Sequence, residues 1–108
     1  MSRRTTRSAI RAMVSQIVDR FHPEQVILFG SHARGDAGPD SDVDLLVVMP
    51  FEGSKRDKEV ELLGVLPSTA GPVDVIVTRP EDFRWRKDVV GTIEWPASHE
   101  GEVLYVRA

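Results

Sequence analysis

The sequence predicts an α/β fold in which helices alternate with strands over one small core. Two observations support this prediction. Short apolar runs rich in β-branched residues alternate with segments whose apolar residues recur every three or four positions. The chain has 108 residues, of which 41% are hydrophobic, so it is long enough for one compact domain and too short for two ordinary ones. We therefore expect a single domain spanning residues 1–108.

The first half of the chain is predicted to form a helix, a strand, a loop and a second strand. Apolar residues between 5 and 21 recur at spacings of three and four, which is typical of an amphipathic helix. The run 25–29 is short, β-branched and stopped by Gly30, as expected of a buried strand. Segment 35–41 is rich in glycine, proline and aspartate and is expected to be a loop. A second buried strand is predicted over 43–49.

The second half repeats this alternation. Helical spacing covers residues 56–66, and a third apolar run, 73–77, reads as a strand with an aspartate inside it. A helix is expected to open at Pro80, and residues 102–106 resemble a last short strand. The apolar and aromatic residues that this last helix is expected to contain are Phe83, Trp85, Val89, Val90 and Ile93.

Composition excludes several classes of protein. The absence of cysteine excludes disulfides and thiolate metal sites, and no apolar run is long enough to span a bilayer or form a secretory signal core. We therefore expect a cytoplasmic protein without a membrane partner. The first eleven residues are basic through Arg3, Arg4, Arg7 and Arg11, which a nucleic-acid arm would explain. We favour a solvated helix end, because nothing later adds a basic stripe, and expect no nucleic-acid partner.

Three aspartates point to metal chemistry. Asp42 and Asp44 border an apolar run, and in a strand their carboxylates would share one face, about 6 to 7 Å apart. Asp74 interrupts the third apolar run, so neighbouring strands would join all three into one cluster. Two magnesium ions held there, about 3.5 to 4 Å apart, could clamp the oxygens of an in-line phosphoryl transfer. The alternatives are solvated acids at a loop end and, for Asp74, an edge-strand acid facing water.

Gly30 and Ser31 supply the complementary half of such a site. A glycine at a strand end lets the backbone approach a phosphate, and a serine adds a hydroxyl donor. If Ser31 opens a short helix, its N-terminal end would favour a phosphate, and Arg34 could add a charge-assisted contact. The alternative for Arg34 is a surface pair with Asp36 or Asp40.

These residues carry a resemblance to a known superfamily. Gly30-Ser31-His32-Ala33-Arg34-Gly35, followed by Ser41-Asp42-Val43-Asp44, resembles the signature of the nucleotidyltransferases related to DNA polymerase beta. The resemblance is strongest to their minimal (MNT) branch and runs over nearly the whole chain, from the first helix to the last predicted strand. It implies a small mixed β-sheet flanked by helices in a polymerase beta-like fold.

The resemblance also implies residue roles and a reaction. Gly30 and Ser31 would hold the nucleotide triphosphate, Asp42 and Asp44 would bind two Mg²⁺ ions, and Asp74 would complete the site and help activate the attacking hydroxyl. The implied reaction transfers AMP from ATP to a hydroxyl, with pyrophosphate leaving. In the MNT branch, the acceptor is often a tyrosine of a HEPN-domain ribonuclease toxin, which the nucleotidyltransferase silences as its antitoxin. A hetero-oligomer with that toxin would follow.

Two other functions compete with this one. The chain could be an antitoxin that masks its partner by contact alone, or a stand-alone enzyme that modifies a small molecule or an RNA end. Several side chains also remain open. His22 and His32 lack a second histidine at ligand spacing, so loop or helix-end roles are favoured over zinc. Trp85 and Trp95 flank a basic cluster and would serve core packing, a nucleobase platform or a partner surface.

Overall fold

A mixed four-stranded sheet, in the order β3-β2-β1-β4, forms the centre of the computed structural model, which describes residues 6–67 and 71–108. The strands are β1 (Gln25–Phe29), β2 (Val43–Val48), β3 (Val73–Thr78) and β4 (Glu102–Val106). β1 pairs antiparallel with β2 and β4, whereas β2 and β3 run parallel. The predicted α/β fold with a small mixed sheet is therefore confirmed.

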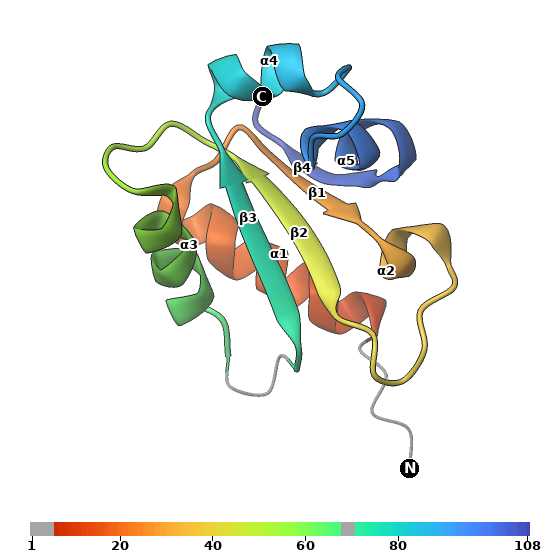
Figure 1. Cartoon of the computed structure of the whole chain (residues 1–108). Coiled ribbons are helices and arrows are strands. Elements are labelled where there is room, and N and C mark those ends of the chain that lie inside the picture. The colour runs from red at the N-terminus through yellow and green to blue at the C-terminus, as the bar shows by residue number, and fades with distance from the viewer. Residues whose placement is uncertain (1–5, 68–70) are drawn as a thin grey trace.

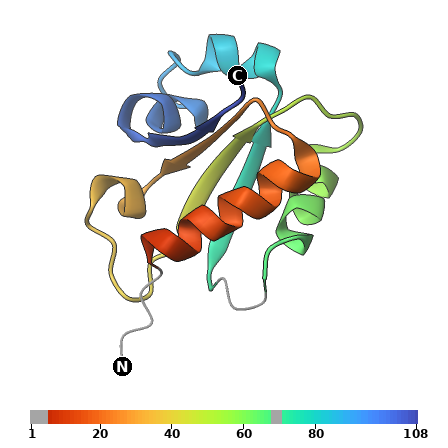
Figure 2. The same cartoon turned by 180° about the vertical axis from the view of Figure 1, so that it is seen from behind.

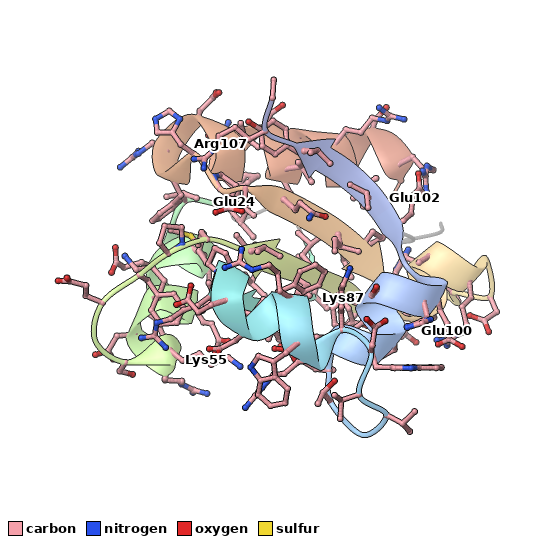
Figure 3. The ribbon with its side chains drawn as sticks, turned by 90° about the horizontal axis from the view of Figure 1, so that it is seen from above. Glu24, Lys55, Lys87, Glu100, Glu102 and Arg107 are labelled. Atoms are coloured by element: carbon pink, nitrogen blue, oxygen red, sulfur yellow. The ribbon has the colours of Figure 1, made fainter. Side chains whose placement is uncertain are left out.

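Helices cover both faces of this sheet, which gives three layers (Figure 3). Helices α1 (Arg7–Phe21) and α3 (Lys55–Gly64) pack on one face, and α1 crosses that face in Figures 1 and 2. Helices α4 (Pro80–Arg86) and α5 (Glu94–Glu100) pack on the other face, and the single turn α2 (Ser31–Arg34) follows β1. None of the helices in the described residues is long and apolar enough to cross a membrane.

The strands feed two hydrophobic clusters because their side chains alternate between the two faces. The larger cluster lies under α1 and α3, and the smaller one under α4 and α5. The buried members of the larger cluster are Ile10, Met13, Val14, Ile17, Val26, Leu28, Val43, Leu45, Val47, Met49, Leu62, Val75 and Val77. Those of the smaller cluster are Ile27, Phe29, Leu46, Val48, Phe83 and Ala97.

Helix α1 agrees with the first predicted helix apart from its start. The Thr6 hydroxyl accepts a hydrogen bond from the backbone N–H of Ala9 at 3.1 Å and so caps the helix, while His22 ends it in the left-handed conformation at φ 50°. His22 therefore has the helix-end role expected of it. Arg7 pairs with Glu102 of β4. The other basic residues at the start of the sequence that precede Thr6, Arg3 and Arg4, lie outside the described residues.

The predicted helix that opens at Pro80 is wrong beyond Arg86. The chain leaves the helix there, turns at Gly91 with φ 99°, and starts α5 at Glu94. The Thr92 hydroxyl lies 2.9 Å from the carbonyl oxygen of Arg86 and 2.8 Å from that of Val89, and both carbonyls also accept a backbone N–H three residues ahead, which is a turn pattern. Residues 87–93 are consequently a turn, not a continuation of the helix.

Two further expectations need correction at the level of side chains. The apolar spacing of residues 56–66 locates α3, but the residue that α3 buries fully is Leu62, whereas Val60 and Leu63 are 57% and 41% exposed. Core packing is wrong for Trp85, whose exposed fraction is 56%. Trp95 is partly buried and stacks on His99 with ring centroids 4.6 Å apart.

Candidate functional site

Asp44 lies at the centre of the candidate site. Each of the two strands beside β2 places one of the site residues predicted from the sequence next to it. On β1, Phe29 lies opposite Asp44, so the adjacent Gly30 is brought to the same place. On β3, Asp74 lies opposite Asp44 in the parallel register. The sequence made the meeting of these two aspartates conditional on their strands being neighbours, and that condition is met.

The carboxylates of Asp44 and Asp74 lie on the sheet face that α4 and α5 share. Alternation along β2 and β3 places Asp44 on the face of Leu46, and Asp74 on the face of Ile76, which both belong to the smaller cluster. Helix α4 follows the opposite end of β3 (Figure 1). Asp74 is exposed, as the edge-strand alternative expects, and it nevertheless lies beside Asp44.

Gly30 approaches the Asp44 carboxylate so closely that a side chain would not fit. Its φ of 76° and ψ of −156° lie in a region that is essentially restricted to glycine. A β-carbon at this position would lie 2.3 Å from Oδ2 of Asp44. The backbone turn at Gly30-Ser31 and the carboxylate of Asp44 therefore line the same small space.

Electrostatic repulsion and burial make the ionised form of Asp44 costly. Burial raises the pKa of the Asp44 carboxyl above its ordinary value, and the neighbouring charges of Asp74 and Asp42 raise it further. The positive charges of His32 and Arg34 act in the opposite direction and are the weaker influences on this pKa. Asp42 and Asp74 are thus both close enough to Asp44 to repel it, and a bound cation would relieve that repulsion.

The loop between α2 and β2 is tied back to α2. The Nε2 atom of His32 lies 3.2 Å from the carbonyl oxygen of Ser41, and the Ser41 hydroxyl accepts a hydrogen bond from the backbone N–H of Gly38 at 2.8 Å. These contacts hold the residue that precedes Asp42 against the helix that follows Gly30. His32 therefore has a local structural partner, which sequence reasoning did not identify because the contact depends on how the loop folds.

Arg34 interacts with both Asp36 and the carboxylate cluster. Its Nε atom lies 3.4 Å from a carboxylate oxygen of Asp36, which is the surface pair that the sequence offered as an alternative. Its charge also lowers the pKa of Asp44, so the guanidinium remains near the carboxylate cluster. Ser31 begins α2 directly after Gly30, and its carbonyl oxygen accepts hydrogen bonds from the backbone N–H groups of Gly35 and Asp36.

The three aspartates suit Mg²⁺ as part of a ligand set shared with a substrate. Among the described residues, no three carboxylate or imidazole side chains converge as a complete protein cage for a metal ion. Magnesium is usually held by one or two carboxylates together with waters and substrate phosphates. Hard carboxylate oxygens that repel one another beside a glycine turn fit that kind of site. The missing ligands would come from the phosphates.

The aromatic residues singled out by the sequence lie outside this constellation. Trp85 belongs to α4, which follows the end of β3 opposite to Asp74, and Trp95 belongs to α5. The exposed side chain of Trp85 lies near the guanidinium group of Arg86, with 5.1 Å between the guanidinium carbon and the ring centroid. A nucleobase platform at this tryptophan would therefore be remote from Asp44.

The sequence and fold match those of nucleotide-transferring proteins. The family model described as "Nucleotidyltransferase domain" matches residues 10–94. A protein of Methanocaldococcus jannaschii, named a "putative protein adenylyltransferase", is 29% identical over 99 residues, which cover 90% of this chain and 95% of that protein.

Two solved structures share the fold. A crystal structure of a "putative nucleotidyltransferase" from Sulfolobus solfataricus superposes with a TM-score of 0.66 at 26% identity, covering 93% of this chain and 79% of that one. A structure described as a toxin-antitoxin with AMP-PNP has a TM-score of 0.59 at 16% identity, covering 92% of this chain and 73% of that one. At that level of identity, the second comparison shows similarity of fold alone.

Proposed function

The chain belongs to the nucleotidyltransferase domain family, and from this premise we propose that it transfers AMP from ATP to a protein hydroxyl in a Mg²⁺-dependent reaction. The proposed catalytic domain spans residues 1–108. The single observation that most supports the proposal is the junction at Asp44. Asp74 pairs with Asp44 across the neighbouring strand β3. On the β1 side, the backbone of Gly30 lies so close to the Asp44 carboxylate that only glycine fits.

Each side chain of the junction has a proposed role. The backbone at Gly30 and Ser31 binds the triphosphate, and Arg34 contributes charge to the same phosphates. The carboxylates of Asp42 and Asp44 hold two Mg²⁺ ions, with Asp74 as a further ligand. The raised pKa of Asp44 supports these roles, because it reflects carboxylates held together against their mutual repulsion. When bound, the metal supplies positive charge that neutralises the phosphates and the carboxylates.

The proposed step is an in-line displacement at the α-phosphorus of ATP. The acceptor hydroxyl oxygen forms a bond to the α-phosphorus, and the bond from that phosphorus to the bridging oxygen of pyrophosphate breaks. Pyrophosphate leaves with the electron pair, and the hydroxyl proton passes to the carboxylate of Asp74. Gly30 and Ser31 keep the triphosphate oriented throughout. Most of the rate enhancement would then come from positioning and charge stabilisation.

We place the acceptor hydroxyl on a tyrosine of a HEPN-domain ribonuclease toxin, with this chain as its antitoxin in the MNT branch. The signature from Gly30 to Asp44 supports this assignment. So do the adenylyltransferase name of the archaeal relative and the toxin-antitoxin description of a structural neighbour. The two proteins would form a hetero-oligomer in the cytoplasm, where ATP is available.

The test is radiolabelling of a HEPN-domain partner with ATP labelled at the α-phosphate, in the presence of Mg²⁺. Asp44→Asn should lower labelling by about 10³-fold or more, because a neutral amide cannot replace the carboxylate at the metal. Asp40→Asn is the matched control, since it makes the same chemical change at an exposed loop position outside the proposed site. Labelling that survives in both variants contradicts the mechanism. If Asp44→Asn still neutralises the toxin in cells, the contact-only antitoxin is correct instead.

A further inference from the structure

The two edges of the sheet differ in how their backbone groups are covered. β3 forms one edge, where a carboxylate oxygen of Glu59 on α3 accepts a hydrogen bond at 3.0 Å from the backbone N–H of Val77. β4 forms the other edge, and within residues 6–67 and 71–108 no strand pairs with its outer side. An edge strand of this kind is a template on which a further strand can pair.

A register shift in the pairing of β4 with β1 brings two valines to the same face. Val103 pairs with Ile27 of β1. Val106 pairs with Gln25, which lies two positions from Ile27 and so shares its face of the sheet. In a regular strand, valines three positions apart would face opposite ways. Val103 and Val106 are 50% and 60% exposed, so the edge strand presents an apolar pair to solvent.

The two ends of β4 carry opposite charges. Glu102 begins the strand and Arg107 follows its last residue (Figure 3). Glu102 forms an ion pair with Arg7 at the start of α1. Arg107 donates a hydrogen bond at 3.1 Å to the carbonyl oxygen of His22, at the end of α1. Both charged groups therefore lie on the α1 face of the sheet, opposite to the two valines.

Helix α1 also carries opposite charges along the side next to β4. Arg11, Ser15 and Asp19 are exposed and spaced four residues apart, so they form a stripe on one side of the helix. Together with Leu104 and Tyr105 of β4, this stripe lines a groove of about 220 Å³. Ser15, the middle of the stripe, therefore lies beside the middle of β4.

We propose that the β4 edge is the interface of a homodimer, in which the β4 strands of two copies of this chain pair antiparallel about a two-fold axis. An axis through the middle of β4, perpendicular to the sheet, sets Val103 opposite Val106 of the second copy. It also sets Glu102 opposite Arg107 of the second copy. Residues paired in this way must share a face of the sheet, and the register shift places both valines on one face.

The same axis makes the stripe on α1 complementary to its own copy. Rotation about the middle of β4 runs α1 antiparallel to the second α1, with the two Ser15 residues nearest the axis. Arg11 of each copy then faces Asp19 of the other. Each contact occurs twice, once in each direction, as an interface with two-fold symmetry requires. The groove between α1 and β4 would be filled by side chains of the second copy.

The charge pattern favours a second copy over an unrelated strand. Any extended segment with apolar side chains can pair with an exposed sheet edge. On both β4 and α1, however, an acid at one end and a base at the other are complementary to the same element in reverse. The dimer would join two four-stranded sheets into one continuous sheet. Asp44 and Asp74 lie on β2 and β3, so the interface leaves both candidate sites uncovered.

Charge-reversal variants of the full chain test the proposed pairing. Glu102→Arg alone and Arg107→Glu alone each set like charges opposite one another, so each should raise the dimer dissociation constant by about tenfold or more. An equimolar mixture of the two variants has opposite charges at both ends of the pairing and should regain most of the wild-type affinity. Sedimentation equilibrium measures the mass. A wild-type chain that stays monomeric at millimolar concentration, or a mixture that binds no more tightly than each variant alone, overturns the proposal.

A second pair of variants separates the interface from the fold. Val106→Lys adds a charge to the edge strand and should abolish the dimer without changing the circular dichroism spectrum. Val60→Lys is the matched control, since Val60 is 57% exposed on α3, and its dimer should persist. Isotope-filtered NMR of mixed labelled and unlabelled chains should show contacts between Val103 methyl groups and those of Val106 in the other copy. A dimer that survives Val106→Lys, or an edge that pairs only with a strand of another protein, contradicts the assignment.

Discussion

At the scale of single residues, the site depends on a close approach between a backbone and a carboxylate. The sequence indicated that Gly30, Asp42, Asp44 and Asp74 carry chemistry, because acids beside apolar strand residues require a partner. It did not indicate that Gly30 and Asp44 touch. That contact arises from the antiparallel register of β1 and β2, which sets Phe29 opposite Asp44. Register depends on how two distant segments pair, so no local pattern contains it.

Replacing Gly30 with alanine should affect both stability and transfer. The positive φ of 76° and the contact of 2.3 Å with Asp44 Oδ2 mean that the added methyl group forces the backbone or the carboxylate to move. We expect a cost of about 1 to 3 kcal/mol and a fall in transfer of about 100-fold, because displaced groups lose their alignment. Thermal unfolding and a labelling assay measure the two effects. An alanine variant with wild-type activity would show that the close approach is dispensable.

The raised pKa of Asp44 leads to a prediction about pH and stability. Because its pKa is higher in the folded state than the ordinary 3.8, the folded protein binds this proton more tightly than the unfolded chain does. The contribution of Asp44 to stability is thus complete below pH 3.8 and is lost as the pH rises through the folded-state pKa. Without ligands, Asp44→Asn should therefore unfold a few degrees above the wild type at pH 7, with no difference at strongly acidic pH. Melting curves across this range measure it, and a lower midpoint for the variant at pH 7 contradicts the prediction.

At the scale of elements, the sequence located most helices and strands but not which side chains they bury. The spacing over residues 56–66 correctly indicated a helix, yet the contacts that hold α3 against the sheet are made by Leu62 and Glu59. The break after Arg86 was missed because Val89 and Ile93 continue an apolar spacing, while the deciding contacts of Thr92 are hydrogen bonds. Periodicity reports local amphipathicity, whereas burial and helix ends depend on tertiary partners.

The packing of α5 against β1 depends on a glycine for reasons of space. A β-carbon at Gly101 would lie 2.3 Å from the carbonyl oxygen of Ala97 and 2.8 Å from that of Leu28. Both are backbone atoms, so Gly101→Ala should destabilise the fold by about 1 to 3 kcal/mol. Gly64→Ala is the control, because nothing lies within 4 Å of its β-carbon, and it should be neutral or stabilise α3 by up to about 1 kcal/mol. Urea denaturation compares the two, and equal midpoints would contradict this packing argument.

At the scale of the whole molecule, one sheet links the two hydrophobic clusters to the candidate site. Phe29 of β1 and Leu46 of β2 belong to the smaller cluster, whereas their neighbours Leu28 and Leu45 belong to the larger one. The same two strands carry Gly30 and Asp44 to one end of the sheet. Disturbing either cluster should therefore also affect how Gly30 and Asp44 are held. Sequence patterns alone could assign the strands, but the strand order that creates this link is a property of the assembled sheet.

Because the sheet joins the site to both hydrophobic clusters, ligand binding should change the free energy of unfolding of the whole domain. Because both clusters share the sheet, we expect a single cooperative unfolding transition over the described residues. ATP with Mg²⁺ at about 100 times the dissociation constant should stabilise the folded state by about 2.7 kcal/mol, which raises the melting temperature by about 10 °C or more. Chelation by EDTA should remove most of that rise, because ATP alone leaves the carboxylates and phosphates repelling one another.

Differential scanning calorimetry measures each shift in melting temperature, and the control variant Asp40→Asn should retain the shift. A rise that is equally large with and without Mg²⁺ would show that the aspartates do not bind the metal, and the proposed ligand set would then have to be abandoned even if ATP binds.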